Sequence, residues 1–157
     1  MPNLISNNLD EFFMKEALLE AKKAYELNEV PVGCVIVKDG EIIARGFNQR
    51  ETGNHVFLHA EMIAIDIACK KLKSWRLDEC VLYVTLEPCL MCSGAMIQSR
   101  LKRLVYGALE PKSGVHQSKM NVFEADFNHQ VEILPLVLQE ESSQLLKSFF
   151  KELRKQK

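Results

Sequence analysis

HAE at residues 59–61 and PCLMC at residues 88–92 are the two segments that decide how this chain is organised. Cys89 and Cys92 are three residues apart at a predicted helix start, so their sulfurs fall on one face of that helix. His59 opens another predicted helix. If the first turns of the two helices point at one place, they bring one imidazole and two thiols to a single ion.

The number of ligands in these segments is informative. Three protein ligands are expected for a catalytic zinc ion, which keeps a fourth position open. A carboxylate beside such a site can act as general base toward water and then as general acid, a contribution of about 10²–10⁴-fold to the rate. Glu61 lies two residues beyond His59, in the same first helical turn, and can lean over the site without being a ligand. The two segments therefore predict zinc-dependent hydrolysis in which Glu61 moves protons.

Each motif has other interpretations when it stands alone. A Cys-x-x-Cys pair in an intracellular chain can be a redox pair or half of a structural zinc site. The Leu90-Met91 filling lacks thioredoxin-like surroundings and does not favour a redox pair. A structural site needs a fourth ligand, and none of the remaining histidines is paired at zinc-finger spacing; these are His55, His116 and His129. The joint occurrence of His-x-Glu, a strand and Pro-Cys-x-x-Cys favours a catalytic site.

Hydrophobic periodicity and turn residues predict alternating helices and strands. The predicted strands span residues 32–37, 41–47, 80–85, 104–106 and 131–134, and the predicted helices span residues 8–26, 59–73, 89–99 and 138–153. Asp39-Gly40 is typical of a hairpin turn, and Asn8 followed by Glu11 is typical of a capping box. Residues 49–57 are predicted to form a loop, and residues 110–128 contain only a short element of unassigned type. Strands joined through helices imply parallel pairing and a sheet covered on both faces.

Length and composition fit one globular domain comprising residues 1–157. Hydrophobic residues make up 47% and charged residues 26% of the chain, which is the range of folded globular proteins. No apolar run approaches the roughly 18–20 residues that span a bilayer, and residues 1–10 lack the pattern of a secretory signal, so no membrane partner is expected. The 5 cysteines, an odd number, argue against a disulfide framework and favour a reducing cytoplasm.

The distribution of charge gives no decisive sign of a nucleic-acid partner. A net charge of −1 produces no global attraction to nucleic acid. Basic residues are nevertheless concentrated in residues 147–157, and others cluster at Arg100, Lys102 and Arg103. Taken alone, such clusters are interpreted as solvated surface.

Taken together, the motifs resemble those of the zinc-dependent nucleobase deaminases, which share the pattern H-x-E…P-C-x-x-C, and in particular the bacterial tRNA-specific adenosine deaminases. The resemblance extends from about residue 12 to residue 155. It rests on Glu29-Val30-Pro31-Val32-Gly33, Gly46-Phe47-Asn48, His59-Ala60-Glu61, residues 83–97, Ser99-Arg100 and Phe149-Phe150. The most specific part is TLEPCLMCSGAM at residues 85–96.

This resemblance implies both a fold and an activity. The fold would be a three-layer α/β/α arrangement of the cytidine deaminase-like type, with a five-stranded mixed sheet between helices. The activity would be hydrolytic deamination of adenosine to inosine at the wobble position of a tRNA anticodon, usually that of an arginine tRNA. The resemblance also implies one Zn²⁺ per subunit, a tRNA anticodon stem-loop as partner, a homodimer and a cytoplasmic location.

Carried over by position, the resemblance assigns roles to individual residues. The zinc ligands would be His59, Cys89 and Cys92, and Glu61 would shuttle protons. Asn48 would hydrogen-bond the base, and the pocket would be lined by Val30, Pro31 and Ala60. The residues in contact with RNA would be Glu110, Lys112, Phe149 and Arg154. Without the resemblance, Asn48 would be interpreted as a turn residue that ends a strand. An RNA substrate also makes the C-terminal helix and the cluster Arg100, Lys102 and Arg103 candidates for phosphate contacts.

Departures from the family pattern and alternative functions remain open. Glu110 stands where an aspartate is common, Val115 where a small residue is common, and Cys34 where alanine is common. A small-molecule deaminase of the same fold would act on guanine, cytosine or a nucleoside with the same two motifs. A non-enzymatic RNA-binding or structural zinc module would not need Glu61. The run at residues 88–96 and the basic tail favour RNA, but they do not identify which tRNAs are substrates.

Overall fold

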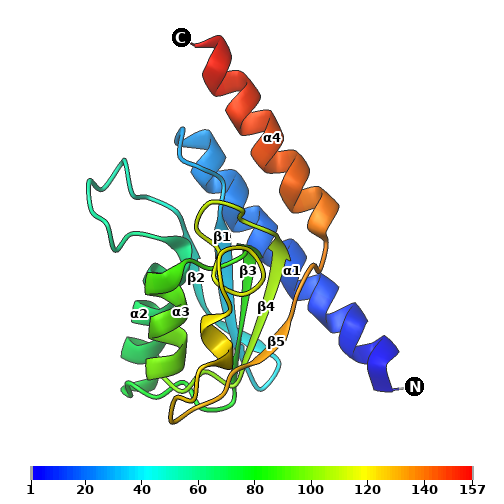
Figure 1. Cartoon of the computed structure of the whole chain (residues 1–157), viewed down its shortest axis with the longest axis vertical. Coiled ribbons are helices and arrows are strands. Elements are labelled where there is room, and N and C mark those ends of the chain that lie inside the picture. The colour runs from blue at the N-terminus through cyan, green and yellow to red at the C-terminus, as the bar shows by residue number, and fades with distance from the viewer. Residues whose placement is uncertain (1, 157) are drawn as a thin grey trace.

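The computed structural model describes the backbone of residues 2–156 and the side chains of residues 8–156. The elements follow in the order α1 (Pro2–Glu26), β1 (Gly33–Lys38), β2 (Glu41–Phe47), α2 (Ala60–Leu72), β3 (Cys80–Leu86), α3 (Leu90–Gln98), β4 (Arg103–Ala108), the 3₁₀ helix η1 (Val122–Glu124), β5 (Glu132–Leu134) and α4 (Gln139–Lys155) (Figure 1). This is the predicted alternation of helices and strands.

The strands form one mixed five-stranded sheet in the order β2-β1-β3-β4-β5. β1 is antiparallel to both β2 and β3, whereas β3, β4 and β5 run parallel. The β1–β2 hairpin turns at Asp39 (φ 52°) and Gly40 (φ 76°), and two positive φ values are what a type I′ hairpin turn requires. The predicted mixed sheet is therefore confirmed.

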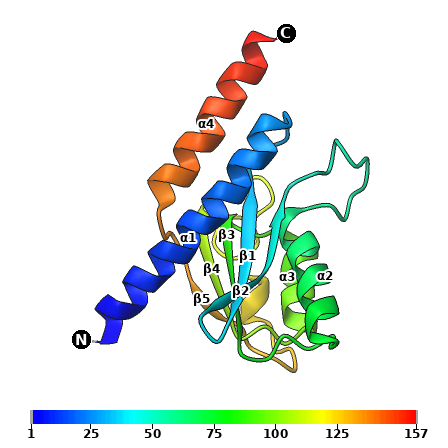
Figure 2. The same cartoon turned by 180° about the vertical axis from the view of Figure 1, so that it is seen from behind.

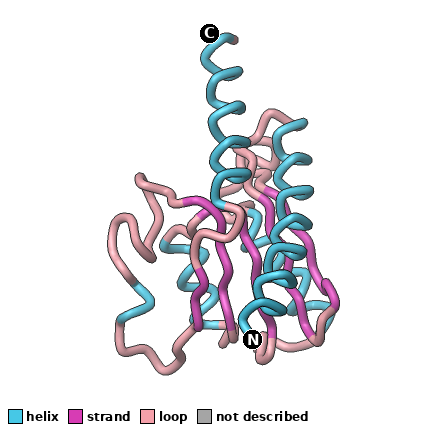
Figure 3. Tube along the Cα trace, turned by 90° about the vertical axis from the view of Figure 1, so that its right-hand side faces the viewer, coloured by secondary structure: helices cyan, strands magenta, loops and turns pink. Residues whose placement is uncertain are grey.

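Helices cover both faces of this sheet. α1 and α4 pack on one face and α2 and α3 on the other, as two opposite views show (Figures 1 and 2). Successive residues of β1 supply the two cores in turn: Cys34 and Ile36 pack toward α2 and α3, and Val35 and Val37 pack toward α1. The C-terminal half of α4 extends beyond the end of the sheet (Figures 1 and 3). The three-layer α/β/α fold is confirmed.

Three local predictions differ from the structure. α1 begins at Pro2, so Asn8 lies within a helix and the predicted capping box is wrong. β4 is longer than predicted because its pairing with β3 continues to Ala108, opposite Leu86, and so carries the strand through Gly107. The unassigned element is η1, whose start is capped by the Asn121 side chain accepting a hydrogen bond from the Phe123 N–H.

The arrangement of α2 and α3 creates the site. β3 leads directly into α3, and β2 leads into α2 through the loop predicted at residues 49–57. A Cβ atom at Gly46 of β2 would overlap the backbone oxygen of Ala60, so this glycine lets the first turn of α2 lie directly on the sheet. Both helices consequently begin at the same end of the sheet. Within the described residues, no helix is long and apolar enough to cross a membrane.

Candidate active site and metal centre

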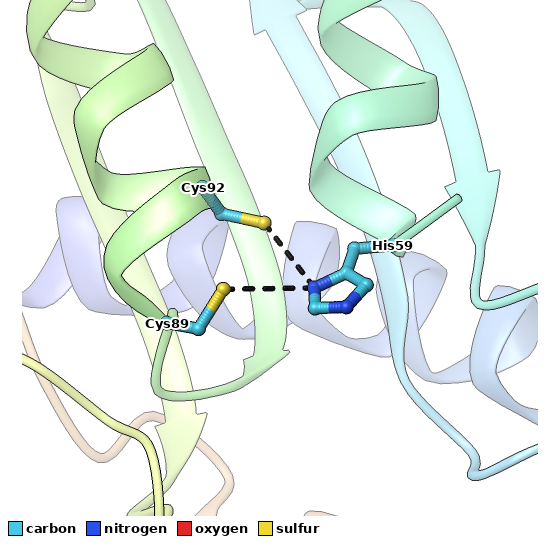
Figure 4. Close-up of side chains that lie close together, drawn as sticks. All are labelled: His59, Cys89 and Cys92. Carbon is cyan, nitrogen blue, oxygen red and sulfur yellow. Dashed lines mark hydrogen bonds between the residues drawn. The ribbon is translucent and has the colours of Figure 1, made fainter. Parts of the chain in front are cut away.

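The two N-cap residues of α2 and α3 face each other. His59 caps α2 and Cys89 caps α3, both in extended conformations, and Cys92 follows one turn later. The Nδ1 atom of His59 lies 3.6 Å from the Cys89 Sγ and 3.5 Å from the Cys92 Sγ (Figure 4). The sequence prediction that these three side chains meet is confirmed.

This spacing fits a zinc ion. Zn–N and Zn–S bonds at a tetrahedral angle place the nitrogen and sulfur about 3.6 Å apart. The observed separations agree with that value, and the donor set of one imidazole and two thiols is one that zinc prefers. Cys92 is fully buried, whereas His59 and Cys89 are partly buried and line the cavity above it. The site therefore fits one Zn²⁺ per chain, with an open side toward the cavity.

The two thiols have different acid strengths. A hydrogen bond from Cys92 lowers the pKa of Cys89 to about 4, and His59 adds to this effect against the opposing effect of burial. The same hydrogen bond and its own burial raise the pKa of Cys92. The hydrogen bond with Cys89 raises the pKa of His59 as well. The pair thus shares one proton, which must leave when a metal takes both sulfurs as thiolates.

Glu61 has the environment of a proton carrier. Its side chain is 4% exposed and lines the same cavity as His59 and Cys89. Burial raises its pKa to about 7, since the charged form loses its hydration. A carboxyl poised near neutral pH can both accept and donate a proton under ordinary conditions. Glu61 therefore lies where a general acid/base is needed.

A cavity of about 190 Å³ opens above these side chains. Its apolar walls come from Val30, Val32, Ala60 and Leu86, so it offers flat hydrophobic contact to a ring. Val30 and Ala60 thus lie where the sequence predicted pocket residues. Pro31 is buried between Val30 and Val32 but is not among the residues lining the cavity.

Asn48 lies at the cavity with part of its amide already bound. Its Nδ2 donates to the Val30 carbonyl at 3.2 Å, and its Oδ1 accepts from the Arg50 N–H at 3.1 Å. A side-chain amide has two N–H donors and two acceptor lone pairs, so one of each remains. The two internal hydrogen bonds fix the amide, and the remaining groups are available to a bound ligand.

The predicted RNA-contacting residues separate into two groups. Glu110 lines the cavity, and Lys112 and Arg154 line an adjoining groove with Leu146, Lys147, Phe150 and Leu153. Phe149, however, is 4% exposed and packs edge-on against Tyr25, with ring centroids 5.5 Å apart. Its predicted contact with RNA is wrong because α1 covers the ring.

Several cavity residues were not predicted, namely Val32, Arg50, Leu86, Glu87, Ser113 and Phe150. Phe150 is 41% exposed and borders both the cavity and the groove. The structure distinguishes the two rings: Phe149 lies seven residues after the buried Ser142 on the inner stripe of α4, and Phe150 faces away from that stripe, but no local sequence signal tells them apart. Arg50 and Ser113 belong to irregular segments and left no such signal.

The cluster of Arg100, Lys102 and Arg103 does not lie at the cavity. Arg103 starts β4 beside Val81 of β3, whereas the site follows the opposite, C-terminal end of β3. Arg103 is bound to the buried Asp10 through two hydrogen bonds, and Lys102 pairs with Glu79. The cluster therefore lies away from the cavity, and its contact with RNA phosphates stays a prediction.

Comparisons with known proteins agree with this site. A family model described as the cytidine and deoxycytidylate deaminase zinc-binding region matches residues 7–108. The chain is 54% identical over 149 residues to the tRNA-specific adenosine deaminase of Bacillus subtilis (strain 168), covering 94% of this chain and 92% of that protein.

Solved structures show the same relationship. A structure from a study of A-to-I editing by tRNA deaminases at the wobble position superimposes with a TM-score of 0.83 at 42% identity, covering 86% of this chain and 99% of the other. The guanine deaminase of Bacillus subtilis superimposes less closely, with a TM-score of 0.60 at 34% identity over 75% of this chain and 86% of that one. The chain therefore belongs to the cytidine and deoxycytidylate deaminase zinc-binding family, and within it to the tRNA-specific adenosine deaminases.

Proposed function

We propose that this protein deaminates adenosine to inosine at the wobble position of a tRNA anticodon, with an arginine tRNA as the expected substrate. The observation that carries the proposal is the buried Glu61 carboxyl in the same cavity as a ligand set with zinc geometry. The 54% identity to a tRNA-specific adenosine deaminase over nearly the whole chain supports adenosine in tRNA as the substrate.

The site residues have complementary roles in this reaction. His59, Cys89 and Cys92 would hold zinc, which when bound supplies a Lewis acid that polarises water. Glu61 accepts one proton from the attacking water and passes it to the ring nitrogen; it then takes the second proton from the new C6 hydroxyl and passes it to the departing amine, leaving the C6 carbonyl. Ammonia leaves and inosine remains. The pKa of about 7 suits Glu61 to both directions of transfer.

The cavity walls orient the base. Val30 and Ala60 contact the faces and edges of the ring, and Asn48 supplies its remaining amide donor and acceptor to the base. Pro31 does not line the cavity itself; its ring fixes the backbone between Val30 and Val32, the two residues that line the wall. The base must leave its stack to enter the cavity, and unstacking costs less in a single-stranded loop than in a duplex. An anticodon loop meets this requirement.

The groove beside the cavity is the proposed path of the flanking RNA. Lys112 and Arg154 supply positive charge along it, and Phe150 supplies an exposed ring at the junction with the cavity. Cations that neutralise phosphates release counterions, so binding through this groove weakens as salt rises. Glu110 lines the cavity and would contact the nucleotide from that side.

Three further properties stay predictions, the first from length, the second from the family resemblance and the third from cysteine usage. They are a single deaminase domain over residues 1–157, a homodimer and a cytoplasmic location. The relatives named above support the first by aligning along nearly the whole chain.

The second candidate is a small-molecule deaminase, which the likeness to a guanine deaminase favours. Such an enzyme would use the same zinc ligands and the same proton carrier, but it would not need the basic groove to bind its substrate. The purified, zinc-loaded protein is incubated separately with unmodified arginine tRNA, guanine, cytosine and adenosine, and ammonia release is measured. We expect release with the tRNA alone. Release from guanine or cytosine without inosine in the tRNA would select the second candidate.

A further inference from the structure

Glu87 is a buried carboxylate that belongs to neither the ligand set nor the proton carrier. It follows β3, precedes Pro88 and Cys89, and is 2% exposed. Its two oxygens accept hydrogen bonds from the N–H groups of Glu110 (3.0 Å), His116 (2.9 Å), Gln117 (2.8 Å) and Ser118 (3.1 Å) and from the Ser118 hydroxyl (2.5 Å). All of these donors belong to one segment, residues 110–118, which is called the rim loop below.

Backbone hydrogen bonds tie the same two segments together. The Glu87 N–H donates to the Ala108 carbonyl at 2.8 Å, and the Val115 N–H donates to the Pro88 carbonyl at 3.1 Å. The rim loop is therefore attached to the turn that leads into Cys89, while Glu110 and Ser113 of the same loop line the cavity. One side chain thus connects the ligand-bearing turn to the edge of the substrate pocket.

Gly114 shows how closely the loop wraps this carboxylate. A Cβ atom at Gly114 would overlap all three atoms of the Glu87 carboxyl group. The side chain could make room only by giving up hydrogen bonds to the loop. The Gly114 N–H in turn donates to the Glu110 carbonyl at 2.8 Å, so the loop closes on itself around Glu87.

The partners of the Glu87 carboxyl are four backbone N–H groups and one hydroxyl. Each of them donates to Glu87, so only a side chain with an acceptor at both positions satisfies them. A glutamine would point an NH₂ group at N–H donors and leave them without partners.

We propose that Glu87 is a positioning residue for the deaminase reaction: it fixes the rim loop against the turn that carries Cys89 and so holds Glu110 and Ser113 at the substrate pocket. The inference rests on the proposed function, because it is the tRNA substrate that the rim loop would meet. Glu61 and the zinc ligands lie on α2, α3 and their N-caps, outside the loop. Loss of the Glu87 carboxylate should therefore weaken substrate binding more than it slows chemistry.

The first test measures how well the amides of the rim loop are protected from hydrogen exchange when no substrate is present. Amide hydrogen exchange is compared between the wild-type protein and Glu87→Gln, both zinc-loaded. We expect the amides of residues 110 and 116–118 to exchange at least about tenfold faster in the variant, as expected when a charged acceptor is lost. Zinc content should stay at the wild-type value.

Asp10→Asn is the matched control. Asp10 is also a buried carboxylate with several donors, Tyr83 and Arg103, but it lies at the opposite end of the sheet. This control should lose stability without changing exchange in the rim loop. If Glu87→Gln does not fold, Ser118→Ala removes one of the donors alone and should give a smaller effect of the same kind.

The second test measures turnover of arginine tRNA. Glu87→Gln should raise KM by about tenfold and change kcat by less than about threefold, with Asp10→Asn close to wild type. Gly114→Ala should also raise KM, but it should have little further effect in a Glu87→Ala background, where the clash is absent. This loss of effect identifies the contact between the two residues as the cause.

The proposal is overturned by unchanged exchange in the rim loop, by loss of zinc from Glu87→Gln, or by a fall in kcat with an unchanged KM. Loss of zinc would show that Glu87 supports the ligand turn instead of the loop. Because the exchange measurement needs no substrate, a wild-type protein that makes no inosine would refute the proposed function separately from the loop result.

Discussion

Glu61 and His59 are two residues apart but have different tasks, because His59 precedes α2 and Glu61 lies inside its first turn. The N-cap position turns the imidazole toward the two sulfurs of α3 (Figure 4). The helical position places the carboxyl in the cavity, where burial raises its pKa to about 7. The ligand and the proton carrier are thus separated by local backbone geometry.

Glu61→Gln tests this separation. The variant keeps the size of the side chain and all three ligands, so it should retain zinc and fold normally, while kcat should fall by about 10²–10⁴-fold because the proton carrier is lost. Metal analysis and single-turnover assays check both parts. Cys89→Ala is the counterpart and should lose the zinc. One full equivalent of zinc in Cys89→Ala would contradict the ligand assignment.

His116 gives a prediction about pH. Burial lowers the pKa of its imidazole, which accepts or donates a 2.8 Å hydrogen bond with the Tyr106 hydroxyl. Since its folded pKa lies below its unfolded value, the unfolded chain binds the proton more readily, and stability is lost as pH falls through about 6.5. His116→Gln should remove part of this loss. Urea unfolding of both proteins at roughly pH 7.5 and pH 5.5 measures it, and an identical loss in the variant would disagree with the assignment.

At the scale of single residues, the sequence predicted what depends on short spacing. Cys89, Cys92, His59 and Glu61 occupy helix starts whose side-chain directions follow from helical geometry. Residues in irregular segments were missed because no period fixes their direction. Arg50, for example, lies in the loop before α2 and reaches the cavity only through tertiary folding.

At the scale of elements, α4 combines a structural face and an edge that borders the cavity and the groove. Its inner stripe packs Phe149 against Tyr25 of α1, and the next residue, Phe150, borders the cavity and the groove. The sequence predicted the amphipathic helix, but it assigned RNA contact to Phe149, which the structure buries. The distinction depends on which neighbour covers each ring, and this information is not local.

Alanine substitutions in α4 separate the two roles. Phe149→Ala should lower stability by about 3–5 kcal/mol, the usual cost of emptying a buried aromatic site, with little change in KM for the tRNA. Phe150→Ala should do the reverse and raise KM with little loss of stability, because its ring is exposed. Denaturant unfolding and steady-state kinetics on the same samples measure the two effects. Similar stability losses in both variants would refute this division of α4.

The remaining elements show why boundaries are harder to predict than order. β2 has the predicted bounds because its hairpin turn fixes one end. β4 extends beyond its predicted end because its pairing with β3 continues to Ala108. The rim loop could not be predicted at all, since its conformation depends on the distant Glu87 carboxylate.

At the scale of the whole molecule, the order of strands is the part that local sequence could not supply. The Asp39-Gly40 turn predicted that β1 and β2 are antiparallel, and the helical connections indicated parallel pairing elsewhere, but nothing local predicted that β1 also pairs antiparallel with β3. The mixed sheet followed from the family resemblance. The same applies to the substrate: spacing indicated hydrolysis at zinc, whereas adenosine in tRNA follows from the relatives and from the basic groove beside the cavity.

The account is tested most directly by sequencing an unmodified arginine tRNA after incubation with the zinc-loaded protein, since reverse transcription reads inosine as guanosine. We predict conversion of adenosine to inosine at the wobble position alone, and no conversion with Glu61→Gln at the same zinc content. Adenosine retained at that position after treatment with the wild-type protein, or equal conversion by the Glu61 variant, would contradict the account.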